Sequence, residues 1–162
     1  MHNINNKSQK NKKKIKTGLA EVAVGLYVWN GQKTINDTLV SLRKQSYKKI
    51  KIFVLDNQST DNTCKIVKKF LHDKRIKLII DKKKRNQADA PFYLLNNYIK
   101  KFKYCMLIGD DDIFHKNYIQ LLISKMLKDD SDLCYSSYKL IDQNRKLWNI
   151  QDTNIYQNNN FF

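Results

Sequence analysis

The apolar residues of this chain change their spacing along the sequence, from nearly unbroken runs to every third or fourth position and back. Unbroken runs of Val, Ile, Leu and aromatic residues are typical of strands buried on both faces. Runs of this kind, some interrupted by one lysine, predict strands at residues 21–29, 50–56, 76–80 and 104–108, and a fifth strand is expected at residues 133–138. Spacing by three and four predicts helices. These are expected at residues 33–45 and 88–100, and around the apolar stripes Ile66, Val67, Phe70, Leu71 and Ile119, Leu122, Ile123, Met126.

This alternation of strands and helices predicts an α/β fold, with a Rossmann-like, mostly parallel sheet flanked by helices and joined by right-handed crossovers. Ligands of such sheets bind beyond the carboxyl ends of the strands. Residues 19–146 are expected to form this domain, with residues 140–146 as a loop or hairpin. Residues 1–18 are predicted to be a disordered basic tail, and residues 147–162 a low-complexity segment.

Composition narrows the class of protein. The 162 residues suit one domain with its own core, and no apolar run is long enough to span a bilayer. The N-terminus has lysines but lacks the apolar stretch of a secretory signal, so a cytoplasmic protein is expected. Three cysteines without a Cys-x-x-Cys pair favour reduced thiols over a disulfide framework or a zinc site.

The net charge is strongly positive, +16, and six lysines with no acid lie in residues 1–18. Such a surplus favours polyanions in general, including nucleic acid, anionic lipid and nucleoside diphosphates. Lysine and asparagine are abundant throughout, however, as is typical of a biased genome, which explains much of the charge without a function. The basic residues form no aromatic-interleaved motif of the RNA-binding type, so specific nucleic-acid binding is not expected.

Three consecutive acids, Asp110, Asp111 and Asp112, follow the strand predicted at residues 104–108 after a single glycine, Gly109. Adjacent carboxylates repel one another unless a cation neutralises them. A hard divalent cation, Mg²⁺ or Mn²⁺, is the natural partner, because it takes oxygen ligands and is usually shared with substrate phosphates. A solvated acidic loop is the alternative, and the position at a strand's carboxyl end favours the metal.

A second polar group follows the strand at residues 50–56. Asp56 ends this strand and is expected to face the ligand crevice, where it can accept hydrogen bonds from a base or a ribose. Ser59 or Thr60 can cap the next helix, and Asp61 would lie at the positive end of that helix. Helix capping therefore explains the latter three residues but does not explain Asp56.

The segment VAVGLYVWNGQKTINDTLVSLRKQSYKKIKIFVLDNQSTDNTCKIV resembles the opening of family 2 glycosyltransferases. That family typically reads V-x-V-x-x-P-x-Y-N-G-x-x-x-I, then S-L-x-x-Q-T-Y, then I-x-V-x-D-x-x-S-x-D-x-T. Further on, Arg85-Asn86 is similar to the family's R-N loop, and LIGDDDIFHKNYI is similar to its D-x-D region. The resemblance covers residues 21–146 and implies the GT-A form of the Rossmann-like fold.

By this resemblance the protein is a glycosyltransferase domain that binds a nucleoside-diphosphate sugar, with a UDP-sugar favoured, together with Mn²⁺ or Mg²⁺. The cation would bridge the diphosphate and stabilise charge on the departing nucleotide. The implied metal ligands are Asp111, as the principal one, and Asp112. Among the implied substrate-binding residues, Asp56 would bind uracil or ribose, and Asn30 would shape the floor of the nucleotide pocket. Asp110 would contact ribose or diphosphate waters. Arg85 would face the diphosphate, and the alternative is that Arg85 is a solvated loop cation.

The sequence departs from the family pattern at several positions. Tyr27 and Lys116 replace prolines, and Gly109 stands where many members carry the first Asp of D-x-D, which leaves the register of that motif open by one residue. Inverting members use an acid in the second half of the domain as the general base. No residue is assigned that role; Asp142 and Asp152 are candidates only by default, and as surface-loop acids they are expected to be inert.

The fold is therefore expected to be truncated at its carboxyl end. A truncated or non-catalytic nucleotide-sugar-binding module is the alternative to an active transferase. A phospho-acceptor receiver domain also gathers acids at strand ends, but its paired acids follow the first strand, which ends here in Trp29-Asn30. The expected acceptor is a glycan or a lipid-linked molecule. Weak contact of the basic tail with anionic membrane would make the protein peripheral at the inner face of a membrane.

Overall fold

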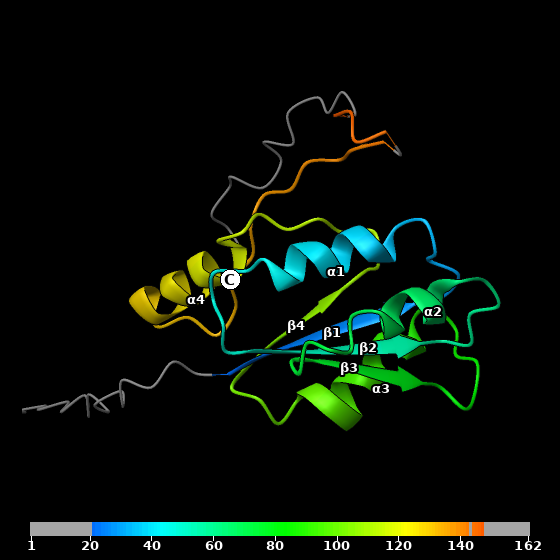
Figure 1. Cartoon of the computed structure of the whole chain (residues 1–162). Coiled ribbons are helices and arrows are strands. Elements are labelled where there is room, and N and C mark those ends of the chain that lie inside the picture. Colours follow the sequence, from blue (N-terminus) through cyan, green and yellow to red (C-terminus); the bar gives the residue numbers. More distant parts are fainter. Residues whose placement is uncertain (1–20, 143, 148–162) are drawn as a thin grey trace, which may run out of the picture. The chain divides into compact units, whose positions relative to one another are not determined.

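The computed structural model describes residues 21–142 and 144–147, so the expectations for residues 1–18 and 148–162 lie outside the described residues. The chain divides into two compact units, Met1–Lys116 and Asn117–Phe162. Figure 1 shows the helices and strands and labels all of them except η1. In chain order they are β1 (Val22–Val28), α1 (Ile35–Arg43), β2 (Ile50–Asp56), α2 (Thr63–Lys68), β3 (Ile76–Ile80), α3 (Asp89–Leu94), η1 (Leu95–Ile99), β4 (Tyr104–Ile108) and α4 (Tyr118–Asp129).

The sheet of the first unit is parallel, as the alternation of strands and helices predicts. Its strand order is β3-β2-β1-β4, and every neighbouring pair is parallel. The strand ends are in register, with Val28 opposite Asp56 and Asp56 opposite Ile80. After β3 the chain crosses to the other side of β1 to form β4. Between β1 and β4 the sheet therefore has the kind of topological switch point where ligand crevices open.

The core covers both faces of this sheet, because alternate residues of a strand point to opposite faces. On one face α3 and η1 close a cluster of buried residues: Ala23, Phe53, Leu55, Ala90, Leu94 and Ile99. The residues that alternate with them are buried on the face that α1 and α2 cover (Figure 1): Val24, Leu26, Ile52 and Val54. Burial on both faces explains why the strands are nearly continuous apolar runs.

The α3 helix continues into η1, a wider helical turn, and together they fill the helix predicted at residues 88–100. Pro91 lies in the first turn of α3, as expected. The pair of segments lies close against β1, where a Cβ atom at Gly25 would come within 2.9 Å of the Leu94 side chain and 3.1 Å of Ile99. A glycine in the middle of β1 therefore allows the close approach of this helix.

Two expectations about secondary structure are wrong. The α2 helix ends at Lys68, before its predicted apolar stripe is complete, and Phe70 reaches the core through a tighter turn in which its N–H donates to the Val67 carbonyl. In the described part of the chain, residues 133–138 pair with no strand, and Leu133 is 79% exposed. A strand needs a neighbour that supplies partners for its N–H and C=O groups, and an apolar run alone does not reveal one.

The second unit contains α4, in which Ile119 and Ile123 are buried, as the apolar stripe predicts. Beyond α4, Ile141 forms an antiparallel bridge with Leu147, which agrees with the loop or hairpin expected at residues 140–146. Within the residues that the structure describes, no helix is long and apolar enough to cross a membrane.

Candidate functional site

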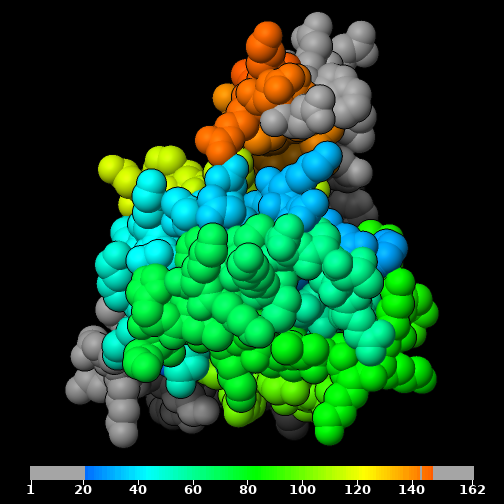
Figure 2. All heavy atoms as spheres, turned by 45° about the vertical axis from the view of Figure 1, so that its right-hand side comes forward, coloured from blue at the N-terminus to red at the C-terminus, as the bar shows by residue number. Residues whose placement is uncertain are grey.

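The candidate site lies at the edge of the sheet where the strands end. The segments after β1, β2 and β3 start side by side because the ends of these strands are in register. The acidic triplet Asp110–Asp112 follows β4, which pairs with β1 on its other side. Figure 2 turns this edge forward and shows the segment after β1, in blue, packed against the segment after β2, in green. The site residues predicted from the sequence therefore all end or follow strands that stop at one edge.

Asp110 is bonded to the beginning of α1. Its Oδ2 accepts a hydrogen bond from the Thr34 hydroxyl at 2.7 Å, and its carbonyl accepts one from the Thr38 hydroxyl at 2.6 Å. Gly31 lies so close that a Cβ atom there would collide with the Asp110 carboxylate. Burial raises the pKa of Asp110, the Thr34 hydrogen bond opposes this rise, and the two following acids add to it. Asp110 thus joins the acidic triplet to α1 across the switch point.

The other two acids of the triplet differ in their partners. Asp112 accepts the Gly109 N–H at 3.2 Å through Oδ2. Partial burial raises the pKa of Asp112, this hydrogen bond opposes the rise, and the charge of Asp111 adds to it. Asp111 is exposed, and among the described residues none donates a hydrogen bond to its carboxylate. Asp111 is therefore the acid of the triplet with both carboxylate oxygens available to an external cation, whereas Asp112 has one oxygen occupied by the Gly109 N–H.

The donor set of the triplet suits a hard divalent cation. Within the described residues, no three His, Cys, Asp or Glu side chains are grouped so as to hold a metal by themselves. Mg²⁺ and Mn²⁺ at nucleotide sites use one or two carboxylates, however, and take their remaining ligands from substrate phosphates and water. Asp111 and Asp112 offer carboxylate oxygens of this kind, and their chemistry fits a cation shared with a diphosphate.

Asp56 is the buried acid of the site, with 2% of its surface exposed. Its Oδ1 accepts the Ser59 N–H at 3.1 Å, and among the described residues none donates to its Oδ2. The backbone is fixed on both sides, because the Asn57 N–H donates to the Val28 carbonyl and the Asp81 N–H donates to the Asp56 carbonyl. A rigid carboxylate with one unused oxygen is suited to accept an N–H or O–H group of a ligand.

The loops after β1 and β2 are hydrogen-bonded to each other through Asn30. Its backbone is left-handed, with φ of 53°, its N–H donates to Ser59 Oγ at 2.9 Å, and its Oδ1 accepts the Thr60 N–H at 2.8 Å. The expected capping role of Ser59 and Thr60 is therefore wrong, because their polar groups bond to Asn30. Asp61 does lie at the start of α2, where its Oδ1 accepts the Thr63 N–H at 2.9 Å.

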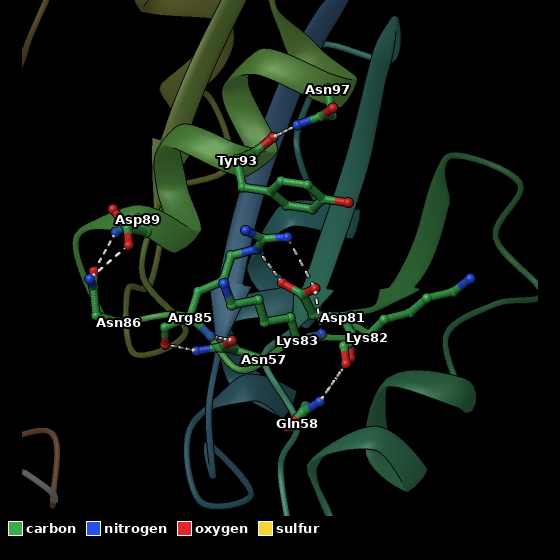
Figure 3. Close-up of polar contacts among 10 residues, drawn as sticks. All are labelled: Asn57, Gln58, Asp81, Lys82, Lys83, Arg85, Asn86, Asp89, Tyr93 and Asn97. Carbon is green, nitrogen blue, oxygen red and sulfur yellow. Dashed lines mark hydrogen bonds and ion pairs between the residues drawn. The ribbon is translucent and has the colours of Figure 1, made fainter.

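Arg85 is held by Asp81, a residue that the sequence analysis does not single out (Figure 3). The Arg85 Nε atom lies 2.6 Å from Asp81 Oδ2, and the guanidinium lies over the Tyr93 ring at 3.5 Å from its centroid. The hydrogen bond to Asp81 raises the pKa of Arg85, against the effect of burial. The sequence does contain a signal for Asp81, since it directly follows β3 as Asp56 ends β2.

Trp29 is a second residue at this edge that the sequence analysis leaves without a role. It directly follows β1 and is 52% exposed, and Lys84 Nζ lies 4.0 Å from its ring centroid. An exposed aromatic ring offers a flat surface on which a nucleobase can stack. The sequence signal for Trp29 is its position, one residue beyond an apolar strand.

Comparisons with known proteins connect this edge to one kind of chemistry. The sequence model of Glycosyl transferase family 2 matches residues 24–162. Over 123 residues the chain is 31% identical to UDP-Glc:alpha-D-GlcNAc-diphosphoundecaprenol beta-1,3-glucosyltransferase WfgD of Escherichia coli, which covers 76% of this chain and 47% of that protein. The chain spans less than half the length of the curated relatives that it matches.

Solved structures share the fold of the chain. TarS 1–349 of S. aureus in complex with UDP-GlcNAc aligns with a TM-score of 0.62 at 22% identity, over 69% of this chain and 32% of that one. The mannosyltransferase PcManGT from Pyrobaculum calidifontis, in complex with GDP-Man and Mn²⁺, aligns with a TM-score of 0.60 at 19% identity, over 68% and 33%. At these identities the likeness concerns the fold, and it confirms the expected GT-A architecture.

Proposed function

This chain belongs to glycosyl transferase family 2, and on that premise we propose that the edge where its strands end binds a nucleoside-diphosphate sugar with a divalent cation for transfer to an acceptor. A UDP-sugar is the favoured donor, because the E. coli relative is named for UDP-Glc and TarS was solved with UDP-GlcNAc. One observation carries the proposal: Asp56 and the acidic triplet Asp110–Asp112 follow strands that end on either side of β1, at the switch point of the sheet.

In this proposal the nucleoside lies over the ends of β1 and β2. Asp56 accepts a hydrogen bond from the base or the ribose through its unused oxygen, Oδ2. Asn30 shapes the floor of the pocket, because its bonds to Ser59 and Thr60 hold the two loops together. Trp29 supplies an exposed ring for the base.

The diphosphate lies toward the acidic triplet. Asp111 and Asp112 hold the cation, which when bound supplies Lewis-acid stabilisation of the charge on the departing nucleotide. Asp110 positions the triplet through its bonds to α1. Arg85, already oriented by Asp81, adds positive charge at the same edge and is suited to phosphate oxygens.

Calorimetric titration of UDP into the full chain, in Mn²⁺ and in EDTA, tests this arrangement. We expect binding that depends on Mn²⁺, because the diphosphate and the carboxylates repel each other without a cation. UMP is the matched ligand control, since it has the same nucleoside and lacks the second phosphate that the cation would bridge. Equal affinity for UDP in Mn²⁺ and in EDTA would contradict the metal-bridged diphosphate.

The acceptor that we propose is a glycan or a lipid-linked molecule, in line with the diphosphoundecaprenol acceptor in the name of the E. coli relative. A lipid-linked acceptor would require the protein to work at a membrane surface. We therefore propose a cytoplasmic protein that is peripheral at the inner face of a membrane, where the lysines of residues 1–18 are attracted by anionic lipid.

A second candidate function is donor binding without transfer. Asp142, one of the two acids left as default bases, accepts the N–H groups of Asn144 and Lys146 through Oδ1 at 2.8 and 2.9 Å, and Asp152 lies outside the described residues. An acid that holds its own turn in this way is poorly placed to take a proton. Radiolabelled UDP-sugars, scored separately for free sugar and glycosylated acceptor, distinguish the two functions. Acceptor-dependent product supports the transferase, and slow hydrolysis alone supports the binding module.

A further inference from the structure

An open hollow of about 690 Å³ lies at the opposite edge of the sheet, where the strands begin. Most of the residues that line it precede or open the strands of the first unit, and Ile52 and Phe53 lie further along β2. Its charged lining residues are Glu21, Lys51, Lys74, Arg75, Lys77 and Lys101. Because β1 has seven residues with a rise of about 3.3 Å each, the hollow lies roughly 20 Å from the candidate donor site. It is therefore a separate place on the molecule.

The hollow carries more positive charge than its own acid can neutralise. Glu21 pairs with Lys51 at 3.4 Å. Among residues 21–142 and 144–147, no acid lies within ion-pair distance of the other three lysines, Lys74, Lys77 and Lys101. Like charges gathered in a concave surface raise the local potential and attract anions.

Two of these lysines lie over aromatic rings. Lys77 Nζ lies 5.9 Å from the ring centroid of Tyr98, and Lys101 Nζ lies 5.9 Å from that of Phe102. A cation above a ring is attracted to it but keeps its full charge. The two ammonium groups are therefore stabilised beside the sheet while they remain able to bind an anion.

Arg75 adds a fixed donor to the lining. Its Nε and Nη2 atoms bind Asp73 at 3.0 and 2.7 Å, and this pairing lowers the pKa of Asp73 to about 2. Its third guanidinium nitrogen, Nη1, is buried, and no described residue accepts a hydrogen bond from it. A buried donor without an acceptor is rare in folded proteins.

We infer that this hollow binds a multiply charged phosphate group. Its source is either a soluble polyphosphate or the headgroups of anionic lipids, which present the same phosphate oxygens. Three lysines without an acid partner, together with the positive charge of Arg75 in the same lining, call for a ligand that carries at least two negative charges and several acceptor oxygens. The site does not depend on the proposed donor site at the other edge.

The test uses the full chain and two probes. Tripolyphosphate is titrated by calorimetry in EDTA, which suppresses binding that depends on a metal at the donor edge. Co-flotation is measured with vesicles of phosphatidylcholine alone and of phosphatidylcholine mixed with phosphatidylglycerol. The hollow variant is Lys77→Gln with Lys101→Gln. The matched control is Lys65→Gln with Lys68→Gln, which removes the same charge from exposed positions of α2.

We expect the hollow variant to lose about tenfold or more in affinity for at least one probe, and the control variant to change by less than about twofold. Loss confined to tripolyphosphate identifies a soluble ligand, and loss confined to anionic vesicles identifies lipid headgroups. Equal losses in both variants, or no binding of either probe by the unaltered chain, would overturn the inference.

UDP binding in Mn²⁺ separates this inference from the proposed function. It should be unchanged in the hollow variant, which also shows that the variant is folded. The single variant Lys77→Gln repeats the comparison if the double variant does not fold. If the chain binds tripolyphosphate through the hollow but fails to bind UDP, the proposed function is contradicted and the phosphate-binding role of the hollow is still supported.

Discussion

The carboxylate of Asp81 and the guanidinium of Arg85 lie 2.6 Å apart at the end of β3, and the Asp81 side chain is only 2% exposed. The Lys83 N–H also donates to this carboxylate at 3.2 Å, so the loop after β3 folds around it. Tyr93 covers the guanidinium at 3.5 Å. Arg85 is thus oriented before a ligand binds, which reduces the rotamer freedom that binding would otherwise remove.

Asp81→Asn tests whether this orientation matters. The variant keeps the shape of the side chain but removes the charge that holds Arg85, so we expect the affinity for UDP in Mn²⁺ to fall by about tenfold, the effect of one charge-assisted hydrogen bond. The thermal midpoint should also fall, because a guanidinium loses its partner. Calorimetry and thermal unfolding measure the two effects.

Asp129→Asn is the matched control for this variant. Asp129 pairs with Lys125 at 2.8 Å with the same sequence separation as Asp81 and Arg85, but both side chains are considerably exposed. Exposed pairs of this type contribute little, so neither the UDP affinity nor the midpoint should change measurably. If both Asn variants behave alike, Asp81 has no special role in holding Arg85.

Gly31→Ala should disturb the acidic triplet from the other side of the switch point. Its new methyl group would collide with the Asp110 carboxylate, so we expect a stability loss of about 1–3 kcal/mol and at least a tenfold loss of UDP affinity in Mn²⁺. Gly25→Ala is the control, since it overpacks Leu94 in the core, away from the triplet. It should lower stability with little effect on UDP affinity once the protein is folded. The reverse order of the two affinity losses would contradict the role given to Gly31.

The raised pKa of Asp110 predicts how stability changes with pH. In the folded chain this carboxyl group keeps its proton to a higher pH than in the unfolded chain. The folded state therefore binds more protons between the two pKa values, and stability falls as pH rises from the ordinary value of 3.8 through the folded value. Below 3.8 both states are protonated, and the destabilising contribution is absent.

Asp110→Asn removes this titration but keeps an oxygen that can accept the Thr34 hydrogen bond. We expect its thermal midpoint to exceed that of the unaltered chain at pH 7, and the difference to shrink toward pH 3. Asp132→Asn, at an exposed position of the second unit, is the control and should show no such trend. A midpoint of Asp110→Asn below that of the unaltered chain at pH 7 would show that the charged form is favoured by the fold.

The sequence predicts the strands well, because their burial on both faces leaves nearly continuous apolar runs. The predicted bounds of β2, β3 and β4 agree with the structure. The strand expected at residues 133–138 is absent, because this segment, which Ser136 and Ser137 interrupt, has no partner strand in the described chain. Periodicity also overextends α2, because Phe70 reaches the core from a turn as effectively as it would from a helix.

The sequence locates the site but not the bonds within it. Asp56 and the acidic triplet could be placed because residues that end parallel strands share one edge. The bonds of Asn30 to Ser59 and Thr60 join positions about thirty residues apart, and no local spacing encodes such contacts. The position of Asp81 directly after β3 can be seen in the sequence, but its burial and its bond to Arg85 can be seen only in the structure.

Trp29→Ala tests the stacking surface. Loss of a base–aromatic contact costs about 1–3 kcal/mol, so the affinity for UDP in Mn²⁺ should fall by about tenfold or more. The affinity for inorganic diphosphate in Mn²⁺ should not change, since that ligand has no base. Phe92→Ala removes another exposed aromatic, on α3, and should affect neither ligand. Equal losses for UDP and inorganic diphosphate would show that Trp29 acts on the phosphates or the fold.

The three acids of the triplet should differ in effect when each is replaced by alanine. Asp111→Ala removes the exposed carboxylate assigned to the cation, and we expect Mn²⁺-dependent UDP binding to fall by about a hundredfold or more. A hundredfold loss of affinity corresponds to about 2.8 kcal/mol, since 1.4 kcal/mol corresponds to tenfold. Asp132→Ala, an exposed acid outside the triplet, should bind UDP normally.

Asp110→Ala and Asp112→Ala should weaken UDP binding less than Asp111→Ala, for different reasons. Asp110 is occupied by the Thr34 hydroxyl, so its loss should appear mainly as a lower thermal midpoint, through the weakened tie to α1. Asp112 already accepts the Gly109 N–H and has less capacity left for a cation. Calorimetry of the three variants at several Mn²⁺ concentrations separates a lost ligand, which shifts the Mn²⁺ dependence, from a displaced loop, which does not. If Asp110→Ala shifts the Mn²⁺ dependence most, the metal-binding register lies one residue earlier, with Asp110 as the principal ligand.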